Sequence, residues 1–80
     1  MTANSVQTRE IMHRRIRALR KREHYTQFEM AERLGISRRT YANYERGIHA
    51  MPVEALVIIA DLFGTSLDYL AGRIPDTQEG

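Results

Sequence analysis

The apolar residues of this chain recur with the spacing of helices rather than with the alternation of strands. Met12, Ile16 and Leu19 follow one another at intervals of four and three residues, which predicts an apolar stripe on a first helix over residues 9–23. Similar spacing continues in later segments, and the chain has no alternating run rich in Val, Ile and Thr. The pattern therefore predicts an all-α protein.

Capping residues divide this pattern into short helices. Thr26 followed by Glu29 is a capping box, in which each side chain bonds the other residue's free backbone N–H, and it predicts a second helix over residues 27–34. Gly35 ends that helix, because glycine adopts the left-handed C-cap conformation at little cost. Ser37 then caps a third helix that reaches Arg46. The short turn between the second and third helices forces a large crossing angle, which is the helix-turn-helix geometry.

Two further helices complete the expected domain. Pro52 is favoured in a first helical turn, and the helix that it begins ends at Gly64. Ser66 caps a final short helix that reaches Ala71. The expected organisation is a loose polar arm, a compact five-helix domain and a tail, over residues 1–8, 9–72 and 73–80.

Size and composition exclude several classes of protein. A chain of 80 residues holds one domain, and the lack of cysteine removes disulfides, a thiol nucleophile and any Cys-ligated zinc site. The longest uncharged apolar run, residues 55–60, is too short to cross a bilayer, and the first ten residues contain no apolar core of a signal peptide. We therefore expect a cytoplasmic protein.

The charges are distributed unevenly along the chain. The net charge is only +2, yet residues 1–46 hold eleven of the 12 Lys and Arg residues and five of the 10 Asp and Glu residues. One basic half suggests an anionic partner, with nucleic acid first. A GC-rich coding sequence, which also raises the arginine content, is the alternative explanation.

The expected third helix has two chemically different sides. At about 100° per residue, Tyr41 and Tyr44 share the side that we expect to pack inward. The opposite side gathers three arginines, a small residue and an amide, namely Arg38, Arg39, Arg46, Ala42 and Asn43. Arginine can contact O6 and N7 of guanine, asparagine N6 and N7 of adenine, and alanine a thymine methyl group. This side is a candidate base-reading surface, with a merely solvated basic face as the alternative.

Together these segments resemble the lambda-repressor/Cro class of helix-turn-helix regulators, also called the XRE family. The resemblance covers residues 12–72 and rests on an ordered set of motifs: Arg17 to Arg20, Thr26-Gln27, Met30-Ala31, Leu34-Gly35, Ile36-Ser37-Arg38, Tyr44-Glu45-Arg46-Gly47 and Ser66-Leu67-Asp68-Tyr69-Leu70. It implies a five-helix domain from a bacterium or phage that binds a palindromic operator on double-stranded DNA as a homodimer. Repression by steric blocking is the default mode of action.

The resemblance also implies roles for individual residues. Base contacts are expected from Arg38, Arg39, Asn43 and Ala42, and phosphate contacts from Thr26, Gln27, Ser37 and Arg46. A structural ion pair between Arg20 and Glu45 would join the first helix to the end of the third and orient the recognition helix.

The expected fourth helix is apolar on nearly all sides. Its core face is expected to comprise Val53, Leu56, Val57, Ile59, Ala60 and Phe63, whereas Ala55, Ile58 and Leu62 form a second stripe. We expect a homodimer to cover this stripe through Ile58 and Leu62. The resemblance adds Leu67 and Tyr69, which stand at positions similar to the family's dimer contact. The alternative is that the arm or the tail covers it within one subunit, with Val6 or Ile74.

Other functions fit the sequence less well. The HExxH, GxSxG and Walker motifs are missing, and no two histidines are four residues apart, so no enzyme, metal, cofactor or small-molecule substrate is expected. The first helix needs its apolar stripe for the core, which argues against membrane binding. The main alternative is an antitoxin or docking module that binds another protein through the apolar face of the fourth helix.

Overall fold

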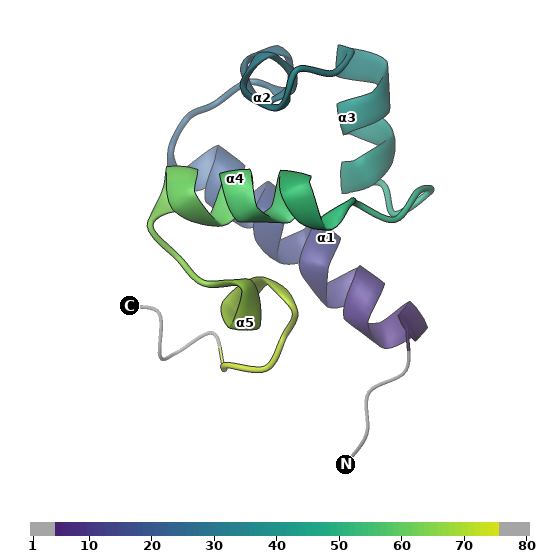
Figure 1. Cartoon of the computed structure of the whole chain (residues 1–80), viewed down its shortest axis with the longest axis vertical. Helices are drawn as coiled ribbons and strands as arrows, with labels where there is room; N and C mark the ends of the chain where they lie inside the picture. The colour runs from purple at the N-terminus through teal and green to yellow at the C-terminus, as the bar shows by residue number, and fades with distance from the viewer. Residues whose placement is uncertain (1–4, 76–80) are drawn as a thin grey trace.

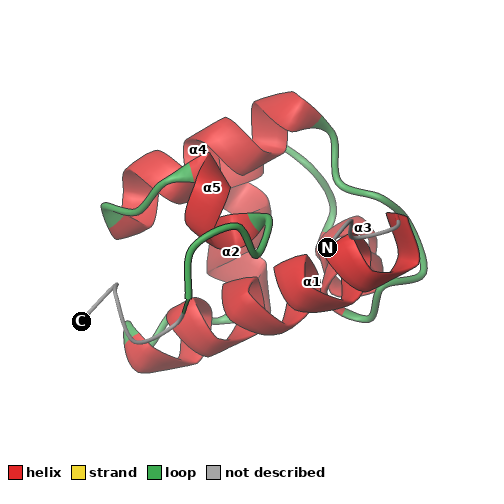
Figure 2. Ribbon diagram, turned by 90° about the horizontal axis from the view of Figure 1, so that it is seen from below, coloured by secondary structure: helices red, strands yellow, loops and turns green. Residues whose placement is uncertain are grey.

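Short turns connect five helices in the described part of the chain, residues 5–75, of the computed structural model (Figure 1). The helices are α1 (Ser5–Arg22), α2 (Gln27–Leu34), α3 (Arg38–Glu45), α4 (Val53–Phe63) and α5 (Leu67–Leu70). The described residues contain no strand, and the prediction of an all-α fold is confirmed. In Figure 2, α1 and α4 occupy opposite sides of the molecule, and α5 lies between them.

Capping interactions set the boundaries of α2 and α3. The Thr26 hydroxyl accepts a hydrogen bond from the Glu29 N–H at 3.0 Å, and the Glu29 carboxylate accepts one from the Thr26 N–H at 2.8 Å. Gly35 ends α2 in the left-handed conformation with φ 69°. The Ser37 hydroxyl accepts from the Thr40 N–H at 3.1 Å where α3 begins. The predicted capping box and helix-turn-helix unit are therefore present.

The first helix begins earlier than predicted. α1 starts at Ser5 rather than Arg9, so residues 5–8 of the expected loose arm are helical. These residues include neither Gly nor Pro, and extending an existing helix through them costs little once nucleation has occurred. Residues 1–4 of the arm and residues 76–80 of the tail lie outside the described residues. Within residues 5–75, no helix is both long enough and apolar enough to span a membrane.

The hydrophobic core lies where all five helices meet. Each helix contributes one fully buried side chain to it: Ile16, Met30, Tyr41, Ile59 and Leu70. Because side chains in such a core interlock at close to crystal density, α3 is held in a defined orientation, chiefly by its packing against α2 and α1.

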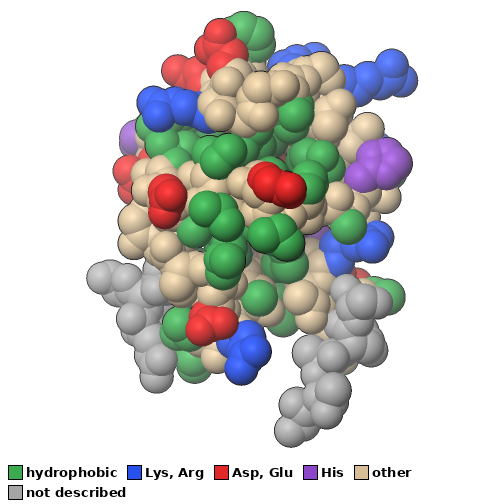
Figure 3. Space-filling view, viewed as in Figure 1, with side chains coloured by type: hydrophobic (Ala, Val, Ile, Leu, Met, Phe, Trp, Pro, Cys, Tyr) green, Lys and Arg blue, Asp and Glu red, His purple; other side chains and the backbone are tan. Residues whose placement is uncertain are grey.

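The orientation predicted for α4 is correct only in part. Leu56, Ile59, Ala60 and Phe63 lie in or against the core as predicted. Ala55 is buried and Leu62 packs against the core, whereas Val53 and Val57, which were expected in the core, are 66% and 41% exposed. A helix that is apolar on most sides does not specify which side faces inward, and the packing of α4 against α2 and α5 decides it instead. Figure 3 shows hydrophobic side chains gathered over α4 with acidic side chains among them. The exposed apolar residues here, which we call the α4 patch, are Val53, Val57, Ile58 and Leu67.

Two of the four residues expected at a dimer interface are covered within the subunit. Tyr69 is 6% exposed and belongs to the core, and Leu62 packs against it. The Arg15 guanidinium lies 4.3 Å from the centre of the Tyr69 ring and donates hydrogen bonds to the carbonyl oxygens of Tyr69 and Ile74, each at 2.6 Å. Ile74 also packs against the core, while Val6 is exposed.

Candidate nucleic-acid interface

The outer side of α3 carries the residues that were expected to contact bases. Arg38, Arg39 and Arg46 are exposed, and Ala42 and Asn43 are half-buried between them. Among residues 5–75, none of these three arginines forms an ion pair. The structure therefore brings the predicted base-reading residues together on one accessible surface, with three guanidiniums that an external ligand can use.

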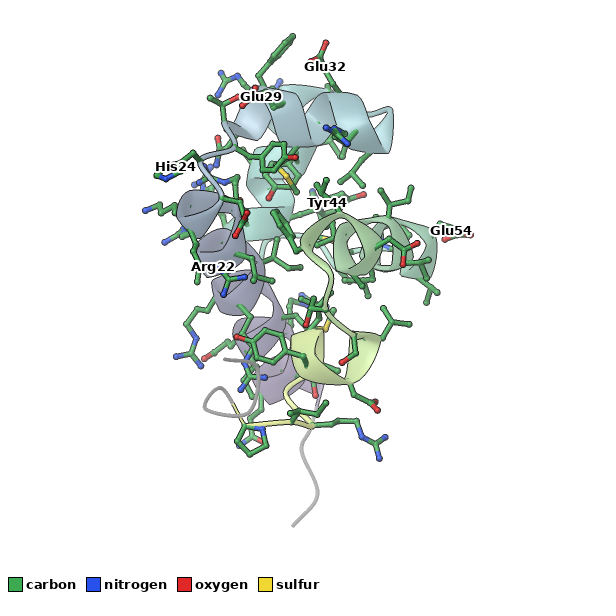
Figure 4. The ribbon with its side chains drawn as sticks, turned by 90° about the vertical axis from the view of Figure 1, so that its left-hand side faces the viewer. Arg22, His24, Glu29, Glu32, Tyr44 and Glu54 are labelled. Carbon is green, nitrogen blue, oxygen red and sulfur yellow. The ribbon has the colours of Figure 1, made fainter. Side chains whose placement is uncertain are left out.

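The opposite side of α3 faces the interior. Tyr41 is completely buried, and Tyr44 is half-buried and lines a small pocket together with Met12, Ile16 and Met51. Figure 4 shows Tyr44 directed from α3 into the molecule, while Glu29 and Glu32 lie on the outer side of α2. The predicted division of α3 into a tyrosine side and an arginine side is therefore confirmed.

A completely buried carboxylate, Glu45, connects the end of α3 to α1 and α2. Arg20 donates to both of its oxygens, from Nε at 2.5 Å and from Nη2 at 3.1 Å. The Tyr41 hydroxyl donates at 2.5 Å and the Gln27 side-chain amide at 3.3 Å. The expected ion pair between Arg20 and Glu45 is thus present, and two further donors complete a four-residue network.

The network holds Glu45 in its charged form. Burial raises the pKa of its carboxyl, but the hydrogen bonds from Arg20, Tyr41 and Gln27 outweigh burial and leave the pKa below the ordinary value. The hydrogen bond to Glu45 raises the pKa of Arg20, despite its own burial. Burial and the bond to Glu45 raise the pKa of the Tyr41 phenol, which stays protonated and donates. Besides Arg20, a second cation lies near the carboxylate, because Arg17 Nε is 3.9 Å from Glu45 Oε1.

The residues expected to contact phosphates lie at the ends of α2 and α3. Thr26 and Gln27 stand at the start of α2, and the bond from Gln27 to Glu45 places that start close to the end of α3. Ser37 caps the start of α3, and Arg46 follows its last residue. The free backbone N–H groups and partial positive charge of a helix start attract phosphate oxygens.

A close contact between α1 and the end of α3 was not predicted from the sequence. Gly47 has φ 74°, and a Cβ atom added to it would lie 3.0 Å from Cδ2 and 3.1 Å from Nε2 of the His13 ring. The ring therefore packs directly against the glycine backbone. His13 Nδ1 is buried, and it has no hydrogen-bond partner among the described residues. The sequence showed Gly47 only as a helix stop and gave no sign of its partner.

Hydrogen bonding and charge attraction are the chemistry that this surface offers. Each arginine presents five N–H donors in a fixed fork, and Asn43 adds an amide that both donates and accepts. No group of three or more His, Asp and Glu side chains among residues 5–75 could hold a metal ion.

Comparison with known proteins links this geometry to a family. Residues 16–70, which include all of α2 to α5, match the Helix-turn-helix family. The HTH-type transcriptional regulator AnsR of Bacillus subtilis is 44% identical over 59 residues, which cover 74% of this chain and 51% of AnsR. The HTH-type transcriptional regulator ImmR of the same organism is 35% identical over 60 residues, or 75% of this chain and 47% of ImmR.

A phage protein gives a similar match. The cryptic phage CTXphi transcriptional repressor RstR of Vibrio cholerae is 44% identical over 54 residues, which cover 68% of this chain and 48% of RstR. This chain therefore spans about half the length of the curated relatives that it matches. No solved structure gives a significant match.

Proposed function

The chain belongs to the XRE-type helix-turn-helix family, and from that premise we propose that it is a sequence-specific transcriptional regulator that binds double-stranded DNA. One observation carries the proposal: α3 presents Arg38, Arg39 and Asn43 on an accessible surface, while the Glu45 network fixes the helix from behind. The names of AnsR, ImmR and RstR, two regulators and a repressor, support it.

In this proposal, the two groups of residues divide the work of recognition. Arg38, Arg39 and Asn43, with Ala42 between them, read base edges in the major groove. Thr26, Gln27, Ser37 and Arg46 contact phosphates, which fixes the register of α3 without reading sequence. The Glu45 network keeps the start of α2 at a constant position relative to α3. Base contacts and phosphate contacts therefore form together.

We propose further that the protein is a homodimeric repressor acting on a palindromic operator. Two copies of α3 would enter successive major grooves about 34 Å apart, one on each half-site. Of the residues expected at the dimer interface, Ile58 and Leu67 remain exposed, and Val53 and Val57 adjoin them in the α4 patch. The bound dimer then blocks transcription sterically, so repression requires no additional interaction surface on the protein.

Selection from a random pool of DNA duplexes with the purified protein tests this proposal. We expect enrichment of one palindromic sequence, bound roughly 10³-fold or more tightly than random duplex. Arg39→Ala should lose the preference for one base pair of each half-site. Arg73→Ala is the control, because it removes the same charge from a residue that pairs with Asp68 of α5. This variant should select the same sequence as the wild type. A pool that stays random after repeated rounds with the wild-type protein would refute sequence-specific binding.

The α4 patch supports a second candidate function, a docking module for another protein. The patch is apolar and exposed, and it surrounds Glu54 and Asp61 on the same helix. Light scattering of the purified protein separates the two functions. A dimer that dissociates in the Ile58→Glu variant assigns the patch to a second copy of this chain, whereas a wild-type monomer leaves the patch for a different partner.

A further inference from the structure

A cleft of about 340 Å³ lies between the first turns of α1 and the end of α3. Arg9 and Arg14 line it from α1, and Arg46 lines it from the residue that follows α3. Two of these three arginines, Arg9 and Arg14, were given no role in the sequence analysis. The cleft therefore joins a part of α1 with no assigned function to the edge of the candidate DNA-binding surface.

The charge of this cleft is unbalanced. Among residues 5–75, Arg9, Arg14 and Arg46 form no ion pair, and Arg14 Nε donates only to the backbone carbonyl of Glu10 at 3.2 Å. Glu10 is the one acidic residue that lines the cleft, so three guanidiniums face one carboxylate. A concave surface with an excess of one charge concentrates its field and attracts ions of the opposite sign.

The walls of the cleft are held together by a direct contact. The His13 ring of α1 packs on the backbone of Gly47 so closely that an added Cβ would come within 3.0 Å of it. Both residues line the cleft. Because Gly47 directly follows Arg46, the contact keeps the backbone of Arg46 beside α1. The cleft is thus built before any ligand binds.

We propose that this cleft binds a phosphate group, and that the phosphate belongs to the DNA backbone that flanks the bases read by α3. Arginine matches phosphate because its planar fork donates two parallel, charge-assisted hydrogen bonds. The DNA backbone is the favoured source because Arg46 belongs to both the cleft and the proposed phosphate-contacting set. The choice of DNA as the source rests on the proposed function. The first turns of α1 then lengthen the footprint of each subunit on the duplex.

The salt dependence of DNA binding tests the proposal. The affinity for a random-sequence duplex longer than two half-sites is measured against salt concentration for the wild type, Arg9→Gln, Arg14→Gln and Arg73→Gln. All three variants lose one positive charge, and glutamine has nearly the helix propensity of arginine. Each lost phosphate contact should reduce the slope of log K against log salt by about 0.9 in the two α1 variants. Arg73→Gln, in the exposed ion pair with Asp68, should keep the wild-type slope.

A second measurement identifies the source of the phosphate. Inorganic pyrophosphate is titrated into isotopically labelled protein while the amide resonance of Gly47 is followed by NMR. Altered slopes in the α1 variants support the DNA backbone as the source. Wild-type slopes, together with a pyrophosphate-induced shift that Arg9→Gln abolishes, keep the phosphate site but overturn DNA as its source. Wild-type slopes and no shift overturn the proposal altogether.

These outcomes are distinguishable from a failure of the proposed function. If the wild-type protein binds no duplex at any salt concentration, the DNA-binding proposal fails, and the pyrophosphate titration alone decides whether the cleft binds phosphate. If the wild type binds duplex DNA with a steep salt dependence that Arg9→Gln and Arg14→Gln leave unchanged, DNA binding stands and α1 takes no part in it.

Discussion

The end of α3 around Glu45 and the outer face of α4 are opposite kinds of environment. Glu45 is completely buried and receives hydrogen bonds from three side chains, whereas Val53 of the α4 patch is 66% exposed. In the first environment, the partners lie within the subunit, and they are specific in chemistry and geometry. The second is apolar and accepts any partner of matching shape. One fixes the orientation of the proposed reading helix, and the other is available to pair two such helices.

Removing Glu45 should lower the free energy of unfolding more than any other substitution considered below. Glu45→Ala leaves Arg20 with an uncompensated charge in a partly buried position. It also removes the carboxylate that accepts the hydrogen bond of the Tyr41 hydroxyl. Breaking one side of a buried ion pair costs about 3–5 kcal/mol. We expect chemical denaturation to show a loss of this size, together with weaker DNA binding. Glu32→Ala, at an exposed position of α2, should change the stability by less than about 0.5 kcal/mol. Equal stability of the two variants would contradict a structural role for the network.

Substitution of Gly47 should have the next largest effect. Alanine at φ 74° costs about 1–2 kcal/mol in backbone strain, and the His13 ring, 3.0 Å from the added Cβ, must also shift, which adds to the cost. Gly35 is a matched control because it has φ 69° and no atom within 4 Å of the added Cβ. Denaturation midpoints should therefore fall further for Gly47→Ala than for Gly35→Ala. In a His13→Ala background, the difference between the two should vanish.

Acid should weaken the end of α3 around Glu45 specifically. The folded-state pKa of Glu45 lies below the ordinary value of 4.5, so its contribution to stability is fully present above that pH. The contribution disappears as the pH falls through the folded-state pKa, with a slope of up to about 1.4 kcal/mol per pH unit for one proton. Denaturation of the wild type and Glu45→Gln between neutral and acid pH should show a shallower acid dependence in the variant. An identical dependence would mean that Glu45 does not titrate differently on unfolding.

A charge in the α4 patch should affect stability least. Ile58 is exposed, so Ile58→Glu should change the free energy of unfolding of the subunit by less than about 0.5 kcal/mol. Its effect should appear in the molar mass measured by light scattering, which should fall from that of a dimer to that of a monomer. Leu62→Glu is unsuitable as a probe, because Leu62 packs against the core and the variant would destabilise the subunit itself.

Features that depend on residues close together in the sequence could be predicted from it. α2 and α3 begin where predicted because their caps, Thr26 and Ser37, act on backbone groups within three residues. Interactions between residues this close together can be recognised in a single sequence. The pair of Arg20 and Glu45 is 25 residues apart, and only the resemblance to a family suggested it.

Features that depend on packing between distant segments were predicted less well. The inward side of α4 was predicted only in part, with Val53 and Val57 placed in the core and Ala55 outside it, because a helix with apolar residues on nearly every side fits several orientations. The contact of His13 with Gly47 joins α1 to the turn after α3 and has no local signal beyond a glycine at a helix end. The early start of α1 at Ser5 was not predicted, because the segment before Arg9 is mostly polar and has only Met1, Ala3 and Val6 as apolar residues. The DNA contacts of individual residues and the dimer remain predictions.

The ratio of affinities for the selected sequence and for random duplex, measured for the wild type, Arg39→Ala and Arg46→Ala, tests the central claim most directly. If the outer side of α3 reads bases, Arg39→Ala should lower this ratio by about 1–3 kcal/mol, or roughly 5- to 150-fold. Arg46→Ala should weaken binding to both duplexes equally and leave the ratio unchanged. Equal loss on both duplexes for Arg39→Ala and Arg46→Ala would contradict the claim that α3 reads sequence.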